Sequence, residues 1–142
     1  MGLSLPPVAA PLAAYVPAIR VGDQVWTSGQ LPLINGTLHA AGKVGAEVDI
    51  EQATEAARVA ALNAIAAAAS LAGGIDAIRR VVKATVFVAS SPGFTGQPGV
   101  ADGASSLLAD VFGDQGNHVR SAVGVAVLPI DAPVELELVV EV

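Results

Sequence analysis

The chain has 142 residues, of which 53% are hydrophobic and only 14% are charged, and its formal net charge is −6. The length fits a single domain spanning residues 1–142, and the absence of cysteine excludes disulfides, thiolate metal sites and cysteine nucleophiles. The acidic balance lacks the positive footprint that nucleic-acid binding needs. So few charges leave little polar surface to cover a monomer, which favours an oligomer.

The N-terminal segment, about residues 1–14, is expected to be extended because prolines interrupt it. It begins without positive charge, so it does not have the pattern of a secretory signal. The longest uncharged run, Val59 to Ile75, is at the short edge of the ~20 apolar residues that a membrane span requires. We therefore expect a cytoplasmic protein that does not bind a membrane.

The first regular element is predicted between Ala18 and Leu31. Gly22-Asp23 separates two short strand-like runs, which is the pattern of a tight hairpin. The second run ends in Thr27-Ser28-Gly29-Gln30, where small side chains would let backbone amides approach a ligand. A further turn is predicted at Asn35-Gly36, followed by a glycine-rich loop over residues 39–48.

A long helix is predicted from Ile50 to about Ala72. Asp49 is a suitable N-cap, Gln52 completes a capping box, and the Gly73-Gly74 pair ends the helix. The apolar stripe is mostly alanine, which allows close approach to a sheet. The run from Val81 to Ala89 is almost continuously apolar, as expected of a strand covered on both faces.

Residues Ser90 to Ala101 are rich in glycine and proline and are predicted to form a loop. A shorter helix is predicted from about Asp102 to Phe112. The order of elements then predicts an α+β domain, with two helices packed on one face of a sheet. The other face of that sheet needs cover, and another subunit could supply it.

The C-terminal stretch, Asn117 to Val142, is predicted to form two strands joined by a turn at Leu128 to Pro133. Both strands alternate between apolar and other residues. If the two strands pair as a hairpin, Arg120 lies opposite Glu141 or a near neighbour. Arg120 then shares a face with Glu135, Glu137 and Glu141. A cation among carboxylates on a face of small residues indicates a functional site.

At this point the residues resemble a known family. The matching segments are Tyr15, residues 26–32 (WTSGQLP), 82–88 (VKATVFV), Arg120-Ser121, Leu128-Pro129 and 134–137 (VELE). Together they resemble the RidA/YjgF family, also known as the L-PSP endoribonuclease family. The resemblance implies a chorismate-mutase-like α+β fold with a mixed sheet, and a homotrimer with clefts between its subunits. It also implies hydrolysis of reactive enamine/imine acids to 2-oxo acids and ammonia, without a metal or organic cofactor.

The resemblance also implies roles for individual residues. Arg120 matches the arginine that grips the substrate carboxylate, and Glu135 matches the glutamate that positions or activates water. Tyr15 and Ser28, with the backbone of Gly29, match residues that line the cleft. Two positions depart from the family pattern. Ala122 stands where the family often has cysteine. The family's asparagine has no clear counterpart, although counting back from Phe112 across a Pro92–Gly103 insertion gives Ser105.

The chemistry agrees with the residue types. A guanidinium can hold both oxygens of a carboxylate, and a carboxylate base can place a water beside an electrophilic imine carbon. Two alternatives stay open. One is a non-catalytic trimer that binds small carboxylates in a regulatory role. The other is a ribonuclease, the activity to which the family name refers. The two histidines, His39 and His118, lie far apart in the sequence and show no pattern of a hydrolase triad.

The predicted hairpin register separates Arg120 from Glu135. The residue opposite Glu135 is about Ala126, and six positions from there to Arg120 span roughly 20 Å at ~3.3 Å per residue. A small imino acid cannot bridge that distance. We therefore expect Arg120 of one subunit to meet Glu135 of the next in a shared site.

Overall fold

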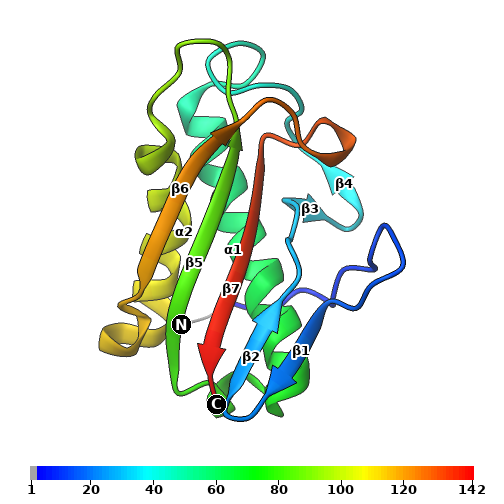
Figure 1. The fold of residues 1–142 in the computed structure, drawn as a ribbon, viewed down its shortest axis with the longest axis vertical. Coiled ribbons are helices and arrows are strands. Elements are labelled where there is room, and N and C mark those ends of the chain that lie inside the picture. The colour runs from blue at the N-terminus through cyan, green and yellow to red at the C-terminus, as the bar shows by residue number, and fades with distance from the viewer. Residues whose placement is uncertain (1–2) are drawn as a thin grey trace.

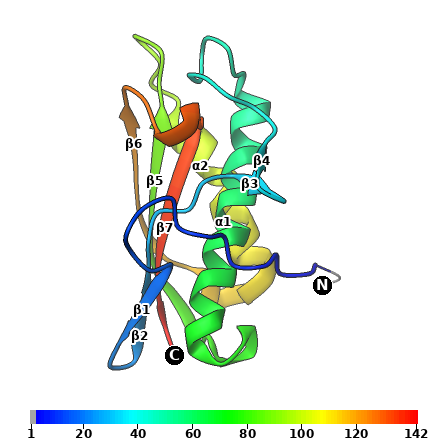
Figure 2. The same ribbon diagram turned by 90° about the vertical axis from the view of Figure 1, so that its right-hand side faces the viewer.

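The computed structural model describes residues 3–142 and shows two layers, a sheet and a pair of helices (Figures 1 and 2). One five-stranded sheet has the order β1-β2-β7-β5-β6, and a small separate hairpin pairs β3 with β4. The strands are β1 (Ala18–Val21), β2 (Gln24–Thr27), β3 (Leu33–Ile34), β4 (Thr37–Leu38), β5 (Arg80–Ala89), β6 (Val119–Val125) and β7 (Val134–Glu141). The helices are α1 (Ile50–Ala72) and α2 (Gln97–Phe112), with short 3-10 turns at Ile75–Ala77, Gly113–Gly116 and Pro129–Asp131.

The sheet is mixed. Strand β6 runs parallel to β5, whereas β5–β7, β7–β2 and β2–β1 are antiparallel pairs. Both helices cover the same face of this sheet, and the opposite face carries no element of the described chain (Figure 2). The predicted α+β fold, with a mixed sheet and two helices on one face, is therefore confirmed.

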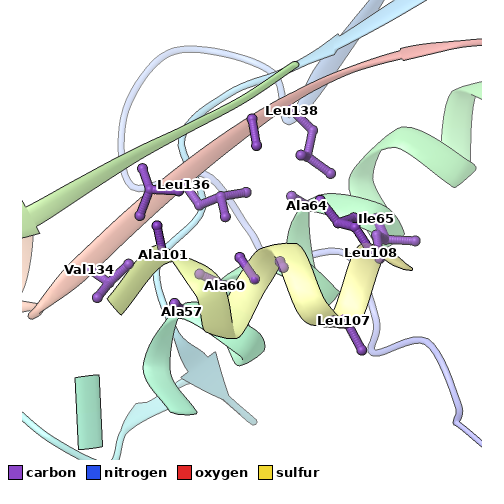
Figure 3. Close-up of a cluster of buried hydrophobic side chains, with 14 of the residues drawn as sticks. Ala57, Ala60, Ala64, Ile65, Ala101, Leu107, Leu108, Val134, Leu136 and Leu138 are labelled. Carbon is purple, nitrogen blue, oxygen red and sulfur yellow. The ribbon is translucent and has the colours of Figure 1, made fainter. Parts of the chain in front are cut away.

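Helix α1 has the predicted boundaries and the predicted cap. The backbone N–H of Gln52 donates to the Asp49 carboxylate at 2.8 Å, and the N–H of Asp49 donates to the Gln52 side chain at 3.0 Å. Gly73 ends the helix in the left-handed conformation, with φ of 100°, which glycine adopts without steric cost. The alanines of α1 let the helix lie close to Leu136 and Leu138 of β7 (Figure 3).

Helix α1 is also long and apolar enough to cross a membrane by length and composition alone. However, 67% of its most apolar window is buried inside the protein. Such burial is typical of a core helix in a folded domain. The packing of α1 against the sheet, seen in Figure 3, accounts for the apolar composition of the helix.

Helix α2 begins at Gln97, so the prediction of a loop up to Ala101 and of a helix from Asp102 is wrong. The prolines and glycines that indicated a loop are tolerated because Pro98 lies in the first turn, where its missing N–H has no helical partner. Val100, Ala101 and Ala104 are fully buried, and this tertiary packing outweighs local propensity. Most of the predicted insertion is therefore helix.

The contact between the helices depends on Gly103. A Cβ atom at this position would overlap the backbone carbonyl oxygen of Thr54 in α1. Backbone cannot move aside as a side-chain tip can, so the glycine sets the closest approach of the two helices. Gly99, in the same helix, faces open space.

We predict that Gly103→Ala lowers the free energy of unfolding by ~1–3 kcal/mol, because overpacking forces the helices apart. Gly99→Ala is the matched control and should be neutral or stabilising by up to ~1 kcal/mol, since alanine favours helix. Chemical denaturation of both variants measures the difference. Equal stability of the two variants would contradict the packing role of Gly103.

The predicted C-terminal hairpin is wrong in its pairing. Strands β6 and β7 run in opposite directions, but β5 lies between them and pairs with both. The connection crosses the end of β5, and two consecutive non-glycine residues in it, Ile130 and Asp131, have positive φ angles of 51° and 61°. Positive φ is rare for a β-branched residue, and sequence periodicity gives no sign of it.

The faces of β6 are also inverted relative to the prediction. Arg120 aligns with Ala84, whose side chain is buried under the helices, so Arg120 points to the helix side. Val119 and Val123 point to the open face, where they are 64% and 44% exposed. Glu135 and Glu137 alternate with the buried Val134 and Leu136, so they also point to the open face. Arg120 and the glutamates of β7 therefore lie on opposite faces of the sheet.

Candidate active site

Arg120 is anchored by groups from helix α2. Its Nη1 donates to Oδ1 of Asp102 at 2.8 Å and to Oγ of Ser105 at 3.1 Å, and its Nη2 donates to the Pro98 carbonyl at 3.4 Å. The side chain is 23% exposed. The ion-pair partner is thus a helix residue, and the glutamates of β7 make no salt bridge with Arg120 within residues 3–142.

Ser105 joins Arg120 to a histidine. The Ser105 hydroxyl lies 2.9 Å from Nε2 of His118, whose Nδ1 lies 2.6 Å from the carbonyl oxygen of Gly116. A hollow of about 310 Å³ is lined here by Ser105, Ala109, Gly116, Asn117, His118 and Arg120. We name these six residues the guanidinium pocket.

Glu135 lies at a second hollow, also of about 310 Å³. Its walls include Leu12, Tyr15, Pro17, Gly29, Gln30, Leu31, Pro129 and Glu135, and we name them the carboxyl pocket. A Cβ atom on Gly29 would come within 2.5 Å of Glu135 Oε1. The Glu135 carboxyl group therefore lies directly over Gly29, and a side chain at position 29 would displace it.

The N-terminal segment forms one wall of the carboxyl pocket. The Ser28 hydroxyl donates a hydrogen bond to the Val16 carbonyl at 2.6 Å, and the backbone N–H of Ser28 donates to the Pro17 carbonyl at 2.8 Å. These bonds hold the segment that carries Tyr15. Ser28 thus serves the pocket by fastening its wall, and it is not itself among the lining residues.

Burial raises the pKa of Glu135, and the negative charge of nearby Glu137 raises it further. Desolvation disfavours the ionised carboxylate, and a like charge acts in the same direction. A carboxyl group whose pKa is moved toward neutrality is a better proton acceptor while it can still return the proton. Perturbed groups of this kind gather at functional sites.

We predict that any turnover with Glu135 as its base is kept at neutral pH in Glu137→Gln and extends to lower pH. Removing the negative charge takes away one cause that raises the pKa of Glu135, so Glu135 stays ionised to a lower pH. Glu141→Gln removes the same charge from the same strand and should leave the pH profile unchanged. The check is to measure activity as a function of pH for the wild type, Glu137→Gln and Glu141→Gln. Large and equal losses of activity in Glu137→Gln and Glu141→Gln would mean that the glutamates of β7 act only as a general electrostatic surface.

The structure therefore divides the predicted site residues into two groups. Ser105 joins Arg120 in the guanidinium pocket, while Tyr15 and Gly29 join Glu135 in the carboxyl pocket. Glu135 aligns through Phe87 with Val123, three residues from Arg120, so the predicted partner Ala126 is wrong. Three residues and two strand spacings give roughly 14 Å within the sheet plane, and the side chains leave it on opposite faces.

Two residues that the hydrogen bonds connect to Arg120, Asp102 directly and His118 through Ser105, are not predicted as site residues from the sequence. The sequence predicts Asp102 only as the start of the second helix, although its spacing of three from Ser105 places both on one helix face. His118 lies two positions before Arg120, and residues two apart in extended chain share a side. Within residues 3–142 no three His, Asp or Glu side chains gather as metal ligands.

Comparison with known proteins identifies the family. The whole chain, residues 1–142, matches the family described as "YjgF/chorismate mutase-like, putative endoribonuclease". Protein TCP17 of Trypanosoma cruzi is 44% identical over 142 residues, which cover 99% of this chain and 89% of that protein. The chain belongs to the YjgF/chorismate-mutase-like family, as its sequence motifs predicted.

Solved structures agree with this assignment. The protein Atu1372 of Agrobacterium tumefaciens is 42% identical, with a TM-score of 0.91 over 99% of this chain and 87% of that one. A protein of Shewanella oneidensis MR-1 named a "putative endoribonuclease" is 35% identical, with a TM-score of 0.95 over 99% and 93% of the two chains. The fold and the family are therefore established together.

Proposed function

We propose that the protein hydrolyses small reactive enamine and imine acids to 2-oxo acids and ammonia. In this proposal, Arg120 of one subunit holds the substrate carboxylate and Glu135 of a neighbouring subunit positions the water. The observation that carries it is the Glu135 carboxyl group, partly buried over Gly29 in a pocket, with its pKa raised by burial. A glutamate that merely faced solvent from a strand would not line a pocket, and burial would not raise its pKa.

The reaction needs few groups. Water attacks the carbon of a protonated imine while Glu135 accepts one of its protons, which gives a carbinolamine. Glu135 returns that proton to the nitrogen, the C–N bond breaks with its electron pair on nitrogen, and ammonia leaves. The carbinolamine hydroxyl loses its proton to solvent and becomes the oxo group. No step requires a metal or an organic cofactor.

The proposal places the site between subunits of a homotrimer. The open face of the sheet exposes several large apolar side chains, which are Ile19, Val21, Trp26, Val119 and Val123. Several large apolar side chains exposed on one sheet face mark an interaction face. Packing three such faces around one axis covers them and brings the carboxyl pocket of one chain toward the β6 edge of the next. Nucleic acid and membranes are not proposed partners, and the cytoplasm is the proposed location.

The test is ammonia release from enzymatically generated 2-iminopropionate and from bulkier imino acids, with Arg120→Ala protein beside the wild type. We expect faster release with the wild type than with the variant or with no protein. Release at the spontaneous rate would overturn the proposal and leave the alternative of a trimer that binds small carboxylates without turnover.

Because the family description names endoribonuclease activity, RNA cleavage is measured on the same preparations. Cleavage that disappears in Arg120→Ala would favour that activity instead.

A further inference from the structure

Arg120 does not stand alone as a cation. A carboxylate, Asp102, lies 2.8 Å from its Nη1, and the two charges form a pair with no net charge. We propose that this pair, with Ser105, selects ligands that carry a carboxylate and a protonated nitrogen on the same carbon. Such ligands are α-iminium and α-ammonium acids. The inference rests on the proposed function, because it takes Arg120 as the carboxylate-binding group.

Asp102 has capacity for a ligand. An ionised carboxylate offers about four acceptor positions, and within residues 3–142 its only side-chain hydrogen bond in the structure is the one from Arg120 to Oδ1. The Asp102 side chain is 66% exposed, so solvent-side acceptor positions stay open to an N–H donor. A protonated nitrogen can therefore bind Asp102 while the ion pair with Arg120 stays intact.

Ser105 is oriented as a second acceptor. The carbonyl of Gly116 only accepts hydrogen bonds, so Nδ1 of His118 carries its proton toward that oxygen. In the neutral ring, Nε2 then accepts the Ser105 hydroxyl proton at 2.9 Å. Arg120 can only donate, so it uses one lone pair of the Ser105 oxygen. The remaining lone pair can accept from a ligand nitrogen, and His118 is thus a positioning residue.

The charges explain why a simple anion fits less well. A carboxylate with no positive group would place its charge close to Asp102 without adding any attraction to that residue. Repulsion of this kind is a common source of specificity. The 2-oxo acid product is such an anion, whereas the protonated imine is a zwitterion. The Arg120–Asp102 pair, with Ser105, is therefore suited to hold the substrate and to release the product.

The test compares two stable ligands with the same carbon skeleton, L-2-aminobutyrate and L-2-hydroxybutyrate, by titration calorimetry. A charge-assisted hydrogen bond to Asp102 should give the amino acid at least about tenfold tighter binding to the wild type. In Asp102→Asn this preference should disappear or reverse, because the negative charge is gone and Arg120 is freed. Asp110→Asn is the control, because Asp110 is an exposed aspartate of the same helix and should not change the preference.

Three results would overturn the inference. They are equal binding of both ligands by the wild type, no binding of L-2-aminobutyrate at millimolar concentration, and an equal loss for both ligands in Asp102→Asn. The last result would mark Asp102 as a structural partner of Arg120. Thermal melting of the variant checks its fold. The test needs no turnover, so a protein with the predicted preference but no ammonia release would overturn only the deaminase proposal.

Discussion

Replacing Arg120 with alanine is expected to abolish deaminase activity and to weaken carboxylate binding by at least about 100-fold. Two hydrogen bonds from a guanidinium to a carboxylate contribute ~3–6 kcal/mol of binding free energy together. The fold should tolerate the change. The side chain lies at a sheet edge, and its ion pair with the exposed Asp102 contributes at most ~1 kcal/mol to stability.

Ligand titration and thermal melting measure the two effects separately. Arg79→Ala is the matched control, because Arg79 is exposed and makes no side-chain hydrogen bond or salt bridge in the described part of the chain. An Arg120→Ala protein that unfolds or loses its oligomeric state would show that Arg120 is a structural member of an ion pair. An unchanged affinity for carboxylates would place the binding site elsewhere.

Glu135→Gln is expected to lose turnover and to keep ligand affinity. Glutamine is similar in shape to glutamate but cannot accept the proton from water. The variant should also be as stable as the wild type or more stable. Because burial raises the pKa of Glu135 in the folded state, ionising this residue destabilises the fold as the pH rises through that pKa.

Melting temperatures across pH check the second part. The difference between Glu135→Gln and the wild type should grow in favour of the variant as the pH rises through the pKa of Glu135. It should vanish at lower pH, where the wild-type carboxyl group is neutral. A variant that is less stable at all pH values would show that Glu135 has a packing role. Retained turnover would exclude Glu135 as the base.

Much of the fold was predictable because local signals decide it. The capping box at Asp49, the glycine stop at Gly73 and the Gly22 turn each act within a few residues, and the structure confirms all three. The start of α2 was not predictable from the same signals, since burial of Val100 and Ala101 outweighs the local effect of Pro98 and Gly99.

The error in strand pairing has a different cause. Alternation along β6 shows that two faces exist but does not say which face is toward the helices. Arg120 and Gly124 are on the helix side, and the valines point away, where only another molecule can cover them. The prediction that Arg120 and Glu135 of one chain lie apart is correct, but its reason is wrong. The sequence argument separates them along a hairpin, whereas in the structure their side chains lie on opposite faces of the sheet.

The central claim is that one site takes Arg120 from one subunit and Glu135 from another. Complementation tests it most directly. Inactive Arg120→Ala protein and inactive Glu135→Gln protein are mixed, their subunits are exchanged, and ammonia release from 2-iminopropionate is measured, with exchange followed by native mass spectrometry. A shared site predicts that mixed trimers regain part of the wild-type activity, because some clefts then combine an intact arginine with an intact glutamate. No recovery despite demonstrated exchange would contradict the shared site.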